Sequence, residues 1–398
     1  MDELFILTNS PGEVSGWVMP VVKELESAQF PAKIRLVVLP CQYASGREAE
    51  YGKEIPGIDT VSTFKELWKN FETHKEVKRL VLQLGGDPLF GALLSAKLRC
   101  GWMIYTKRPK WKKRVEHYFV PDSASEERFE LQGVKKDMFT KVGNLIFDST
   151  PECKDLDEAR RVMGLSEGEE AISFLAGSRP FEYRDGFAFF TCAAMEFLNK
   201  HPNYHVFLPV APVVDENLLK EGLKSAGLNW SGGSKPEEIL WEGPNRIRFI
   251  RENNFEAIKA SSLAVAFPGT NNLQIVSLSV PLLAVVPMNQ VENIPMDGIP
   301  GIIPMSVPGA KALKKKLVYW YSKRLKYASL PNRMTGKEIV PEHRGVMTPS
   351  MVAALVEDLI SDPERLSEIV RGYSCIYHER GAAAKIARKV SDYFSSGN

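Results

Sequence analysis

The chain has 398 residues, of which 44% are hydrophobic and 25% charged, a composition typical of a globular protein and unlike that of a disordered one. This length exceeds one ordinary core and suits two domains of roughly 150 to 200 residues each, with a cleft as the default expectation. Lys and Arg number 51 against 49 Asp and Glu, so the net charge of +2 argues against a nucleic-acid partner.

Cysteine usage and the N-terminal sequence favour a cytoplasmic protein. The five cysteines are scattered without CxxC pairs or a histidine cluster, so neither a disulfide framework nor a metal site is expected. The N-terminal run MDELFILTNS lacks the basic region of a signal peptide and predicts a first core strand. The longest apolar stretch, Val276 to Met288, contains two prolines and is shorter than the ~20 residues that span a bilayer. We therefore expect any membrane contact to be peripheral.

The first half alternates short β-branched strands with amphipathic helices, which is the pattern of a parallel sheet covered on both faces. In chain order, we expect a strand at 4–8, a helix at 16–27, strands at 33–39 and 79–84 with a helix at 64–71 between them, and a strand-like end at 139–142. This order predicts a Rossmann-like domain over residues 1–150. The charged segment 151–169 then suits a linker with a short helix.

The second half, residues 151–381, repeats this architecture. It predicts a strand at 171–175, a helix at 186–200, strands at 205–210, 247–250 and 263–266, and a helix from about residue 271. A proline-rich apolar insertion at 287–310 interrupts this alternation of strands and helices, because neither a helix nor a central strand tolerates so many prolines. An amphipathic helix closes the chain at 382–398.

The loops that follow the strands are the candidate sites, because ligands bind beyond the carboxyl ends of open parallel sheets. After the first strand, the loop TNSPGEVSG contains glycines and small polar residues that let the backbone approach a ligand closely: Gly12, Ser15 and Gly16. Glu13 in this loop either binds sugar hydroxyls or acts as a base, or it simply interacts with the helix dipole. Spacing alone leaves both interpretations open.

Asp87 follows the strand at 79–84 in the sequence Gly-Gly-Asp-Pro. An aspartate at a strand end, in a loop freed by two glycines, can point into a cleft and accept a proton from a hydroxyl nucleophile. Turn chemistry alone would also select this sequence, so the catalytic and the structural interpretation stand side by side.

Two further loops predict an anion site in the second half. The strand at 171–175 leads into Gly177-Ser178-Arg179, where the guanidinium fork and neighbouring donors suit a pyrophosphate, although a plain surface turn would have the same sequence. The strand at 263–266 leads into Gly269-Thr270-Asn271, which suits a phosphate at a helix start or ordinary helix capping. Two such loops in one half make a shared site more plausible than either alone.

The order of these motifs resembles the lipid A disaccharide synthase family of inverting glycosyltransferases, which have the GT-B fold of two Rossmann-like domains facing across a cleft. The resemblance covers almost the whole chain, and the order and spacing of its motifs carry it rather than any single motif. The motifs are PGEVSG, LGGD, VGNLIFD at 142–148, FLAGSRPFE, PGTNNLQ, and SLPNRMTGKEIVPE at 329–342.

The resemblance implies a UDP-sugar donor on the C-terminal domain, no metal or other cofactor, and direct attack by an acceptor hydroxyl with inversion. It implies that Asp87 is the general base, and that Glu13 and Ser15 lie on the acceptor side. A closing helix that packs back on the N-terminal domain and a homodimer are both compatible with it. The residues matching the donor-binding motifs are Gly177, Ser178, Arg179, Gly269, Thr270, Asn271, Gln274, Asn332, Glu338 and Glu342.

Three positions depart from the family pattern. Trp17 stands where the family usually has Asp after the first motif, Asn144 replaces a usual His, and Gln274 replaces a Glu that holds the nucleotide ribose. Glutamine still hydrogen-bonds a ribose hydroxyl, though without charge. The departures indicate a divergent relative whose acceptor differs from the usual acylated glucosamine 1-phosphate.

Two basic segments suggest contact with an anionic membrane surface. KRPKWKKR at 107–114 combines six bases with a tryptophan, although a solvated loop would have the same composition. KALKKKLVYWYSKRLK at 311–326 interleaves bases with apolar residues, as an interfacial helix does and as a core-packed helix with a basic outer face also would. The residues expected at the surface of the membrane are Lys110, Trp111, Lys112, Lys113 and Trp320.

Together these observations predict a glycosyltransferase, peripheral on the inner face of the cytoplasmic membrane, that uses a UDP-sugar and a lipid-linked acceptor. One alternative is a UDP-sugar epimerase or hydrolase, which would form product from the donor alone. The other is a nucleotide-sugar-binding protein without turnover, which the changes at Trp17 and Gln274 motivate.

Overall fold

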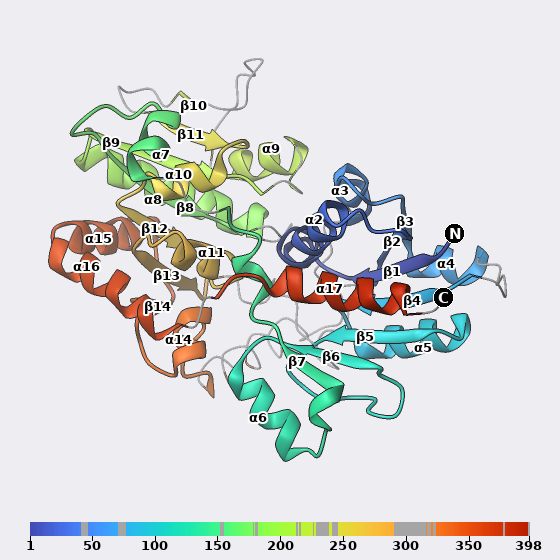
Figure 1. The fold of residues 1–398 in the computed structure, drawn as a ribbon. Helices are drawn as coiled ribbons and strands as arrows, with labels where there is room; N and C mark the ends of the chain where they lie inside the picture. Colours follow the sequence, from blue (N-terminus) through green and yellow to red (C-terminus); the bar gives the residue numbers. More distant parts are fainter. Residues whose placement is uncertain are drawn as a thin grey trace. The chain divides into compact units, whose positions relative to one another are not determined.

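The computed structural model describes two compact units, unit 1 (Met1–Ser149 with Tyr377–Asn398) and unit 2 (Thr150–Ile376) (Figure 1). The described residues are 1–40, 47–70, 77–151, 155–177, 179, 182–211, 214, 216–225, 227, 239–240, 246–289, 316, 320, 324–376 and 379–396. The last segment of the chain thus belongs to the unit that the first segment begins.

Unit 1 is built on a parallel sheet whose strands, among the described residues, run in the order β3-β2-β1-β4-β5-β6-β7. The order reverses between β1 and β4, which is where open α/β sheets place their ligand crevice. The strands are β1 (Glu3–Thr8), β2 (Lys33–Val38), β3 (Thr60–Thr63), β4 (Arg79–Gln83), β5 (Gly101–Tyr105), β6 (His117–Val120) and β7 (Phe139–Lys141). The helices are α1 (Pro11–Glu13), π-helical η1 (Val14–Val18), α2 (Met19–Ser27), α3 (Glu48–Glu54), α4 (Phe64–Asn70), α5 (Pro88–Leu98), α6 (Ser123–Leu131), the short 3-10 turns η2 (Lys136–Met138) and η3 (Leu145–Phe147), and α17 (Ala382–Ser395).

Successive residues of β1 point to opposite faces of the sheet and enter different hydrophobic clusters. Leu4 and Ile6 join a cluster that includes Ile386 and Val390 of α17, whereas Phe5 lies in the cluster on the other face. All five side chains are fully buried. The C-terminal helix is therefore part of the core of unit 1, and it packs against α2 (Figure 1).

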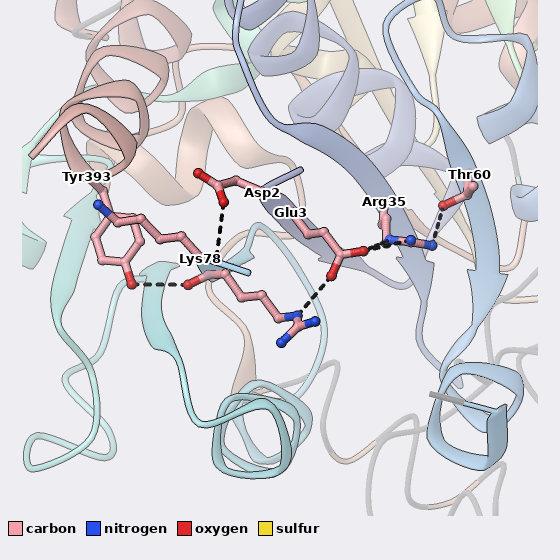
Figure 2. A network of polar contacts seen from close by, with 7 residues as sticks. Asp2, Glu3, Arg35, Thr60, Lys78 and Tyr393 are labelled. Carbon is pink, nitrogen blue, oxygen red and sulfur yellow. Dashed lines mark hydrogen bonds and ion pairs between the residues drawn. The ribbon is translucent and has the colours of Figure 1, made fainter. Parts of the chain in front are cut away.

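Polar contacts hold α17 at both of its ends. At its start, the carboxylate of Asp148 accepts hydrogen bonds from the backbone N–H groups of Gly381 (2.7 Å) and Ala383 (2.6 Å). Near its end, the Tyr393 hydroxyl donates to the Arg79 carbonyl oxygen at 3.0 Å, and the Lys78 ammonium lies 5.0 Å from the centre of the Tyr393 ring (Figure 2).

A buried carboxylate joins three strands at the amino edge of the same sheet. Glu3 on β1 accepts hydrogen bonds from the Nε atoms of Arg35 on β2 and Arg79 on β4, both at 2.8 Å (Figure 2). Burial by itself would raise the pKa of Glu3, but the hydrogen bonds and charges of the two arginines outweigh it and lower that pKa below its usual value. The carboxylate is thus held in its ionised form.

Unit 2 is a second sheet, with its described strands in the order β10-β11-β9-β8-β12-β13-β14. β10 pairs with β11 in antiparallel fashion, and the remaining neighbours are parallel. The strands are β8 (Glu170–Leu175), β9 (Tyr204–Pro209), β10 (Ile239–Leu240), β11 (Arg246–Ile250), β12 (Leu263–Ala266), β13 (Leu282–Pro287) and β14 (Glu342–Gly345). The helices are α7 (Leu156–Val162), π-helical η4 (Glu182–Phe187), α8 (Ala188–Lys200), α9 (Glu216–Ser225), α10 (Asn254–Lys259), α11 (Asn271–Ser277), α14 (Leu330–Thr335), α15 (Pro349–Ile360), α16 (Pro363–Gly372) and the 3-10 turn η6 (Tyr373–Cys375).

The predicted fold class, an α/β protein with two Rossmann-like domains, is confirmed. The predicted helices at 16–27 and 186–200 prove to be parts of longer segments that contain π-helical turns. The first segment runs through α1, η1 and α2, and the second begins with η4. Most of the insertion expected at 287–310 lies outside the described residues, as does most of 311–326. No helix among the residues that the structure describes is both long and apolar enough to cross a membrane.

Candidate functional site

The loops after β1 and β4 lie side by side, because these strands pair in parallel from Glu3 and Arg79 onward. Glu13 accepts a hydrogen bond from the backbone N–H of Asn9 at 3.2 Å, and the Thr8 hydroxyl lies 3.4 Å from the same oxygen. Its carboxylate therefore turns back toward the end of β1.

Glu13 also packs directly against the Gly-Gly-Asp loop. A Cβ atom added to Gly85 would lie only 1.9 Å from the Glu13 Oε2 atom, so any larger residue at this position would displace the carboxylate. Gly86 adopts a φ of 75°, in the region that glycine adopts without strain. The structure thus brings together the two loops that carry the predicted catalytic acids.

Asp87 is the N-cap residue of α5. Its Oδ1 atom accepts a hydrogen bond from the Leu89 N–H at 2.8 Å, and its side chain is exposed. Asp87 thus has a structural role, as a helix cap in addition to the turn that its sequence indicates, and its exposed carboxylate is also accessible to a substrate. Its role as a base stays a prediction.

Gln83, which the sequence interpretation missed, fixes the shape of this loop. It is the last residue of β4 and is 1% exposed, and its Nε2 atom donates to the carbonyl oxygens of Gly85 (3.0 Å) and Asp87 (2.9 Å). One buried amide thereby ties both ends of the Gly-Gly-Asp turn. The signal in the sequence was a glutamine at the end of a largely apolar strand.

The acceptor-side residues of the first loop have structural contacts of their own. The Ser15 hydroxyl donates to the Pro11 carbonyl oxygen at 3.1 Å. Gly16 is buried, and a Cβ atom there would lie 2.6 Å from the Ile146 side chain, so this glycine permits close packing. Trp17, the departure from the family pattern, packs edge-on against the buried Tyr105 with ring centres 5.4 Å apart. Gly12 lies within the short helix α1.

In unit 2, the loops after β8 and β12 are likewise neighbours, because these strands pair in parallel and end at Leu175 and Ala266. Arg179 follows β8, and its guanidinium lies 3.4 Å from the Glu182 carboxylate, which also accepts the Arg179 backbone N–H at 2.9 Å. Gly177 has a φ of 97°, and a Cβ atom there would lie 2.2 Å from Glu182. Ser178 lies outside the described residues.

Glu182, another residue that the sequence interpretation passed over, occupies the position against the loop where an anion is expected. A carboxylate that accepts a backbone N–H and contacts an arginine makes the contacts that a phosphate oxygen would make. The loop after β8 therefore has the donor geometry for an anion. Glu182 also belongs to the FLAGSRPFE motif and begins η4, just as Glu13 directly precedes η1 in unit 1.

Asn272 organises the loop after β12. It is fully buried, and its side chain accepts the Gly269 N–H at 3.3 Å and donates to the Phe267 carbonyl oxygen at 3.0 Å. Thr270 is the N-cap residue of α11 but makes no side-chain capping bond. Asn271 and Gln274 follow on α11 and are partly exposed. Asn272 was not among the predicted residues, because its role depends on backbone contacts within the loop.

Two residues of the SLPNRMTGKEIVPE motif are engaged in internal contacts. Asn332 is fully buried and hydrogen-bonds the backbone of Ile339 and Val340. The Glu342 carboxylate accepts the Ser329 N–H at 2.9 Å and pairs with Arg344 at 2.6 Å. Burial would raise the pKa of Glu342, but these hydrogen bonds outweigh burial and lower it.

Both residues therefore hold the segment 328–340, which contains α14, and Glu338 in that segment is exposed. Any donor contact of these three residues stays a prediction.

The residues expected at a membrane are exposed where they are described. Lys110, Lys112 and Lys113 are exposed, and Trp111 is 43% exposed. Trp320 is 53% exposed, with the Arg324 guanidinium 3.8 Å from the centre of its ring.

The curated proteins that the chain resembles include lipid-A-disaccharide synthases, at low sequence identity. No family model matches. The chain is 23% identical over 392 residues to a lipid-A-disaccharide synthase from Erwinia tasmaniensis, with 92% of each chain covered. It is 23% identical over 395 residues to the lipid-A-disaccharide synthase of Serratia proteamaculans, which covers 92% of this chain and 91% of that one.

Solved structures with the same arrangement are more distant in sequence. A putative UDP-N-acetylglucosamine 2-epimerase from Listeria monocytogenes has a TM-score of 0.55 at 12% identity, covering 100% of this chain and 97% of that one. The UDP-GlcNAc 2-epimerase of Neisseria meningitidis, bound to UDP-GlcNAc, has a TM-score of 0.54 at 12% identity, with 98% and 100% covered. MurG of Acinetobacter baumannii has a TM-score of 0.50 at 11% identity, with 98% and 100% covered. These similarities show the GT-B fold.

Proposed function

Starting from its position as a divergent relative of the lipid-A-disaccharide synthases with a GT-B fold, we propose that the chain is an inverting, metal-independent glycosyltransferase. It moves a sugar from a UDP-sugar to a lipid-linked acceptor. The observation that carries the proposal is that the motif loops of each unit follow adjacent parallel strands, β1 with β4 and β8 with β12. In this fold such loops form the ligand crevice.

In the proposed reaction, unit 2 binds the nucleotide diphosphate. Arg179 and the backbone N–H groups of its loop exchange the Glu182 carboxylate for phosphate oxygens, and the neighbouring Gly269 lets the loop after β12 approach the same group. These fixed donors stabilise the negative charge that develops as the bond between the sugar and UDP breaks.

Unit 1 supplies the acceptor side of the reaction. The acceptor hydroxyl attacks the anomeric carbon while Asp87 accepts its proton, so one C–O bond forms as the bond to UDP breaks. Glu13 and Gln83 hold the loop that carries Asp87, Glu13 by packing against Gly85 and Gln83 through its amide. The basic residues Lys110, Lys112 and Lys113 with Trp111 and Trp320 then bind the protein to the inner face of the cytoplasmic membrane, where the acceptor resides.

Nucleotide binding tests this proposal most directly. We expect calorimetric titration to show binding of UDP and a UDP-sugar but not of GDP-mannose, and Arg179→Ala to weaken UDP binding by about tenfold or more. Arg371→Ala, which removes an exposed arginine of α16 in the same unit, is the matched control and should leave the affinity unchanged.

Three results would count against the proposal. If no uridine nucleotide binds, unit 2 does not contain the proposed donor site. If Arg179→Ala and Arg371→Ala change the affinity equally, Arg179 does not contact the nucleotide. Product formed from a UDP-sugar without any acceptor would instead indicate an epimerase or hydrolase.

A further inference from the structure

The loop after β8 in unit 2 already holds a carboxylate. The Glu182 Oε2 atom accepts the Arg179 backbone N–H at 2.9 Å, and the Glu182 Oε1 atom lies 3.4 Å from the Arg179 guanidinium. The side chain of Glu182 is 13% exposed, and it packs so closely against Gly177 that a Cβ atom there would overlap it. One carboxylate therefore uses both the backbone donor and the guanidinium that Arg179 offers to an anion.

The backbone that carries Glu182 is held in place by the next residue, Tyr183. Tyr183 is fully buried, its hydroxyl accepts the Ala211 N–H at 3.1 Å, and its ring stacks on that of Phe187 with centres 5.3 Å apart. The Tyr183 carbonyl oxygen lies so close to Gly222 on α9 that a Cβ atom there would be only 2.8 Å away. The Cα atom of Glu182 thus stays beside the loop, and rotation of the side chain is the movement that empties or refills the anion position.

The Glu182 carboxylate and a phosphate oxygen of a nucleotide cannot use the same donors at the same time. A nucleotide therefore binds the fraction of molecules in which the Glu182 side chain has turned away, and its apparent dissociation constant rises as that fraction falls. The Arg179 side chain is 39% exposed, so water reaches the pair and solvates a displaced carboxylate. An ion pair this exposed contributes little net stability, so a diphosphate with its larger charge displaces it.

We propose that Glu182 is a built-in competitor of the nucleotide diphosphate, which lowers the affinity of unit 2 for UDP and thereby limits inhibition by this product. The identity of the nucleotide rests on the proposed function. Because the carboxylate belongs to the same chain, it refills the position without depending on the concentration of any solute. The residue that occupies the loop in the free protein thus limits how tightly the product stays bound.

Two substitutions of Glu182 separate occupation of the anion position from charge alone. Glu182→Gln keeps the length of the side chain and removes its charge, whereas Glu182→Asp keeps the charge and draws the carboxylate back by about 1.5 Å, the length of one C–C bond. Glu364→Gln, which removes an exposed carboxylate of α16 in the same unit, is the control. The full chain is titrated by calorimetry with UDP and with inorganic pyrophosphate, and uridine binding is followed by ligand-observed NMR. Thermal unfolding checks that each variant is folded.

We expect Glu182→Gln to raise the affinity for UDP and for pyrophosphate by about tenfold. Glu182→Asp should raise both affinities as well, because its carboxylate no longer reaches the donors of Arg179. The affinity for uridine, which has no phosphate to compete, should stay the same in every variant. Glu364→Gln should change the affinity for UDP by less than about twofold, because its exposed charge is screened.

Three results would overturn this inference and leave the donor site in place. Weaker UDP binding by Glu182→Gln would show that Glu182 holds Arg179 ready for the nucleotide, and an unchanged affinity would show that the carboxylate does not compete. A rise in Glu182→Gln without one in Glu182→Asp would show an effect of charge rather than of occupation. If neither the unsubstituted chain nor Glu182→Gln binds UDP, the donor site itself is absent, and the proposed function fails together with this inference.

Discussion

Asp87 has a structural contact that is separable from its proposed catalytic role. Its side chain caps α5, and asparagine is as good an N-cap as aspartate. Asp87→Asn should therefore keep the fold and UDP affinity, while sugar transfer falls by about a hundredfold or more because the amide cannot accept the proton. Steady-state rates and thermal unfolding of the same sample measure both effects.

Asp87→Ala provides the complementary comparison. It removes the cap as well as the base, so it should also lower the stability of unit 1 by about 1 kcal/mol. Transfer that persists at the full rate in Asp87→Asn would mean that another group takes the proton.

For individual residues, the candidate loops could be predicted from the sequence, whereas the residues that determine the shape of these loops became apparent only in the structure. An apolar run followed by glycine and small polar residues marks a strand end, which is why the loops at Glu13, Asp87 and Arg179 were identified as candidates. Gln83 and Asn272 were missed because their amides act on backbone carbonyl and N–H groups whose positions depend on the folded turn. The glutamine at the end of β4 could be noticed in the sequence, but residue types alone do not tell which backbone groups its amide contacts.

Among the elements, the contact of Glu3 with Arg35 and Arg79, which connects β1, β2 and β4, should weaken at low pH. The pKa of Glu3 is lowered in the folded state, so its ionisation contributes stability that is present above the unfolded pKa and is lost as the pH falls through the folded pKa. Glu3→Gln should be less stable than the wild type by about 2 kcal/mol at neutral pH. The difference should shrink as the pH falls from about 5 to about 3.

Urea unfolding across this range measures the difference. Glu50→Gln, which removes an exposed carboxylate paired with Arg47, is the control and should show no such pH dependence. A difference between Glu3→Gln and wild type that stays constant down to the lowest pH would show that the charge of Glu3 is not what joins the strands.

The start of α17 depends on one carboxylate, that of Asp148. Asp148→Ala removes two charge-assisted hydrogen bonds to Gly381 and Ala383, and we expect unit 1 to lose about 1–2 kcal/mol. Asp392→Ala, an exposed acid on the same helix, should stay within about 0.5 kcal/mol of the wild type. Chemical denaturation measures the stability of the two variants, and hydrogen exchange of the α17 amides reports local opening of the helix. If Asp148→Ala is as stable as Asp392→Ala, packing alone holds the helix.

Elements with strong apolar patterns were predicted to within a few residues, and the weakly patterned ones were not. The predicted strand at 79–84 is observed as β4 (Arg79–Gln83). β14 has the sequence EHRG, which lacks an apolar alternation, and it forms because it lies in register beside β13. The π-helical turns η1 and η4 were also beyond prediction, since helical periodicity alone does not distinguish them from α-helix.

For the whole molecule, the division into two compact units predicts that each unit unfolds in its own transition. α17 contributes buried side chains to the core of unit 1, among them Ile386, Val390 and Phe394. At roughly 2 kcal/mol for each large side chain, their removal approaches the 5–15 kcal/mol that holds a typical domain together. Deletion of residues 377–398 should therefore unfold unit 1 and leave unit 2 folded.

Differential scanning calorimetry measures this outcome directly. The full chain should show the transitions of both units, and the shortened chain should retain the one of unit 2 and its binding of UDP. Loss of both transitions would mean that unit 2 does not fold by itself, and retention of both would mean that α17 is dispensable.

The placement of α17 has a consequence for biosynthesis. A ribosome makes β1 well before α17, so the face of the sheet that α17 shares with α2 is only partly covered until α17 has left the exit tunnel. All of unit 2 is translated before that moment, and its sequence is continuous. Unit 1 is thus begun before unit 2 and completed after it, and until α17 emerges the nascent chain carries a partly open hydrophobic face that chaperones can bind.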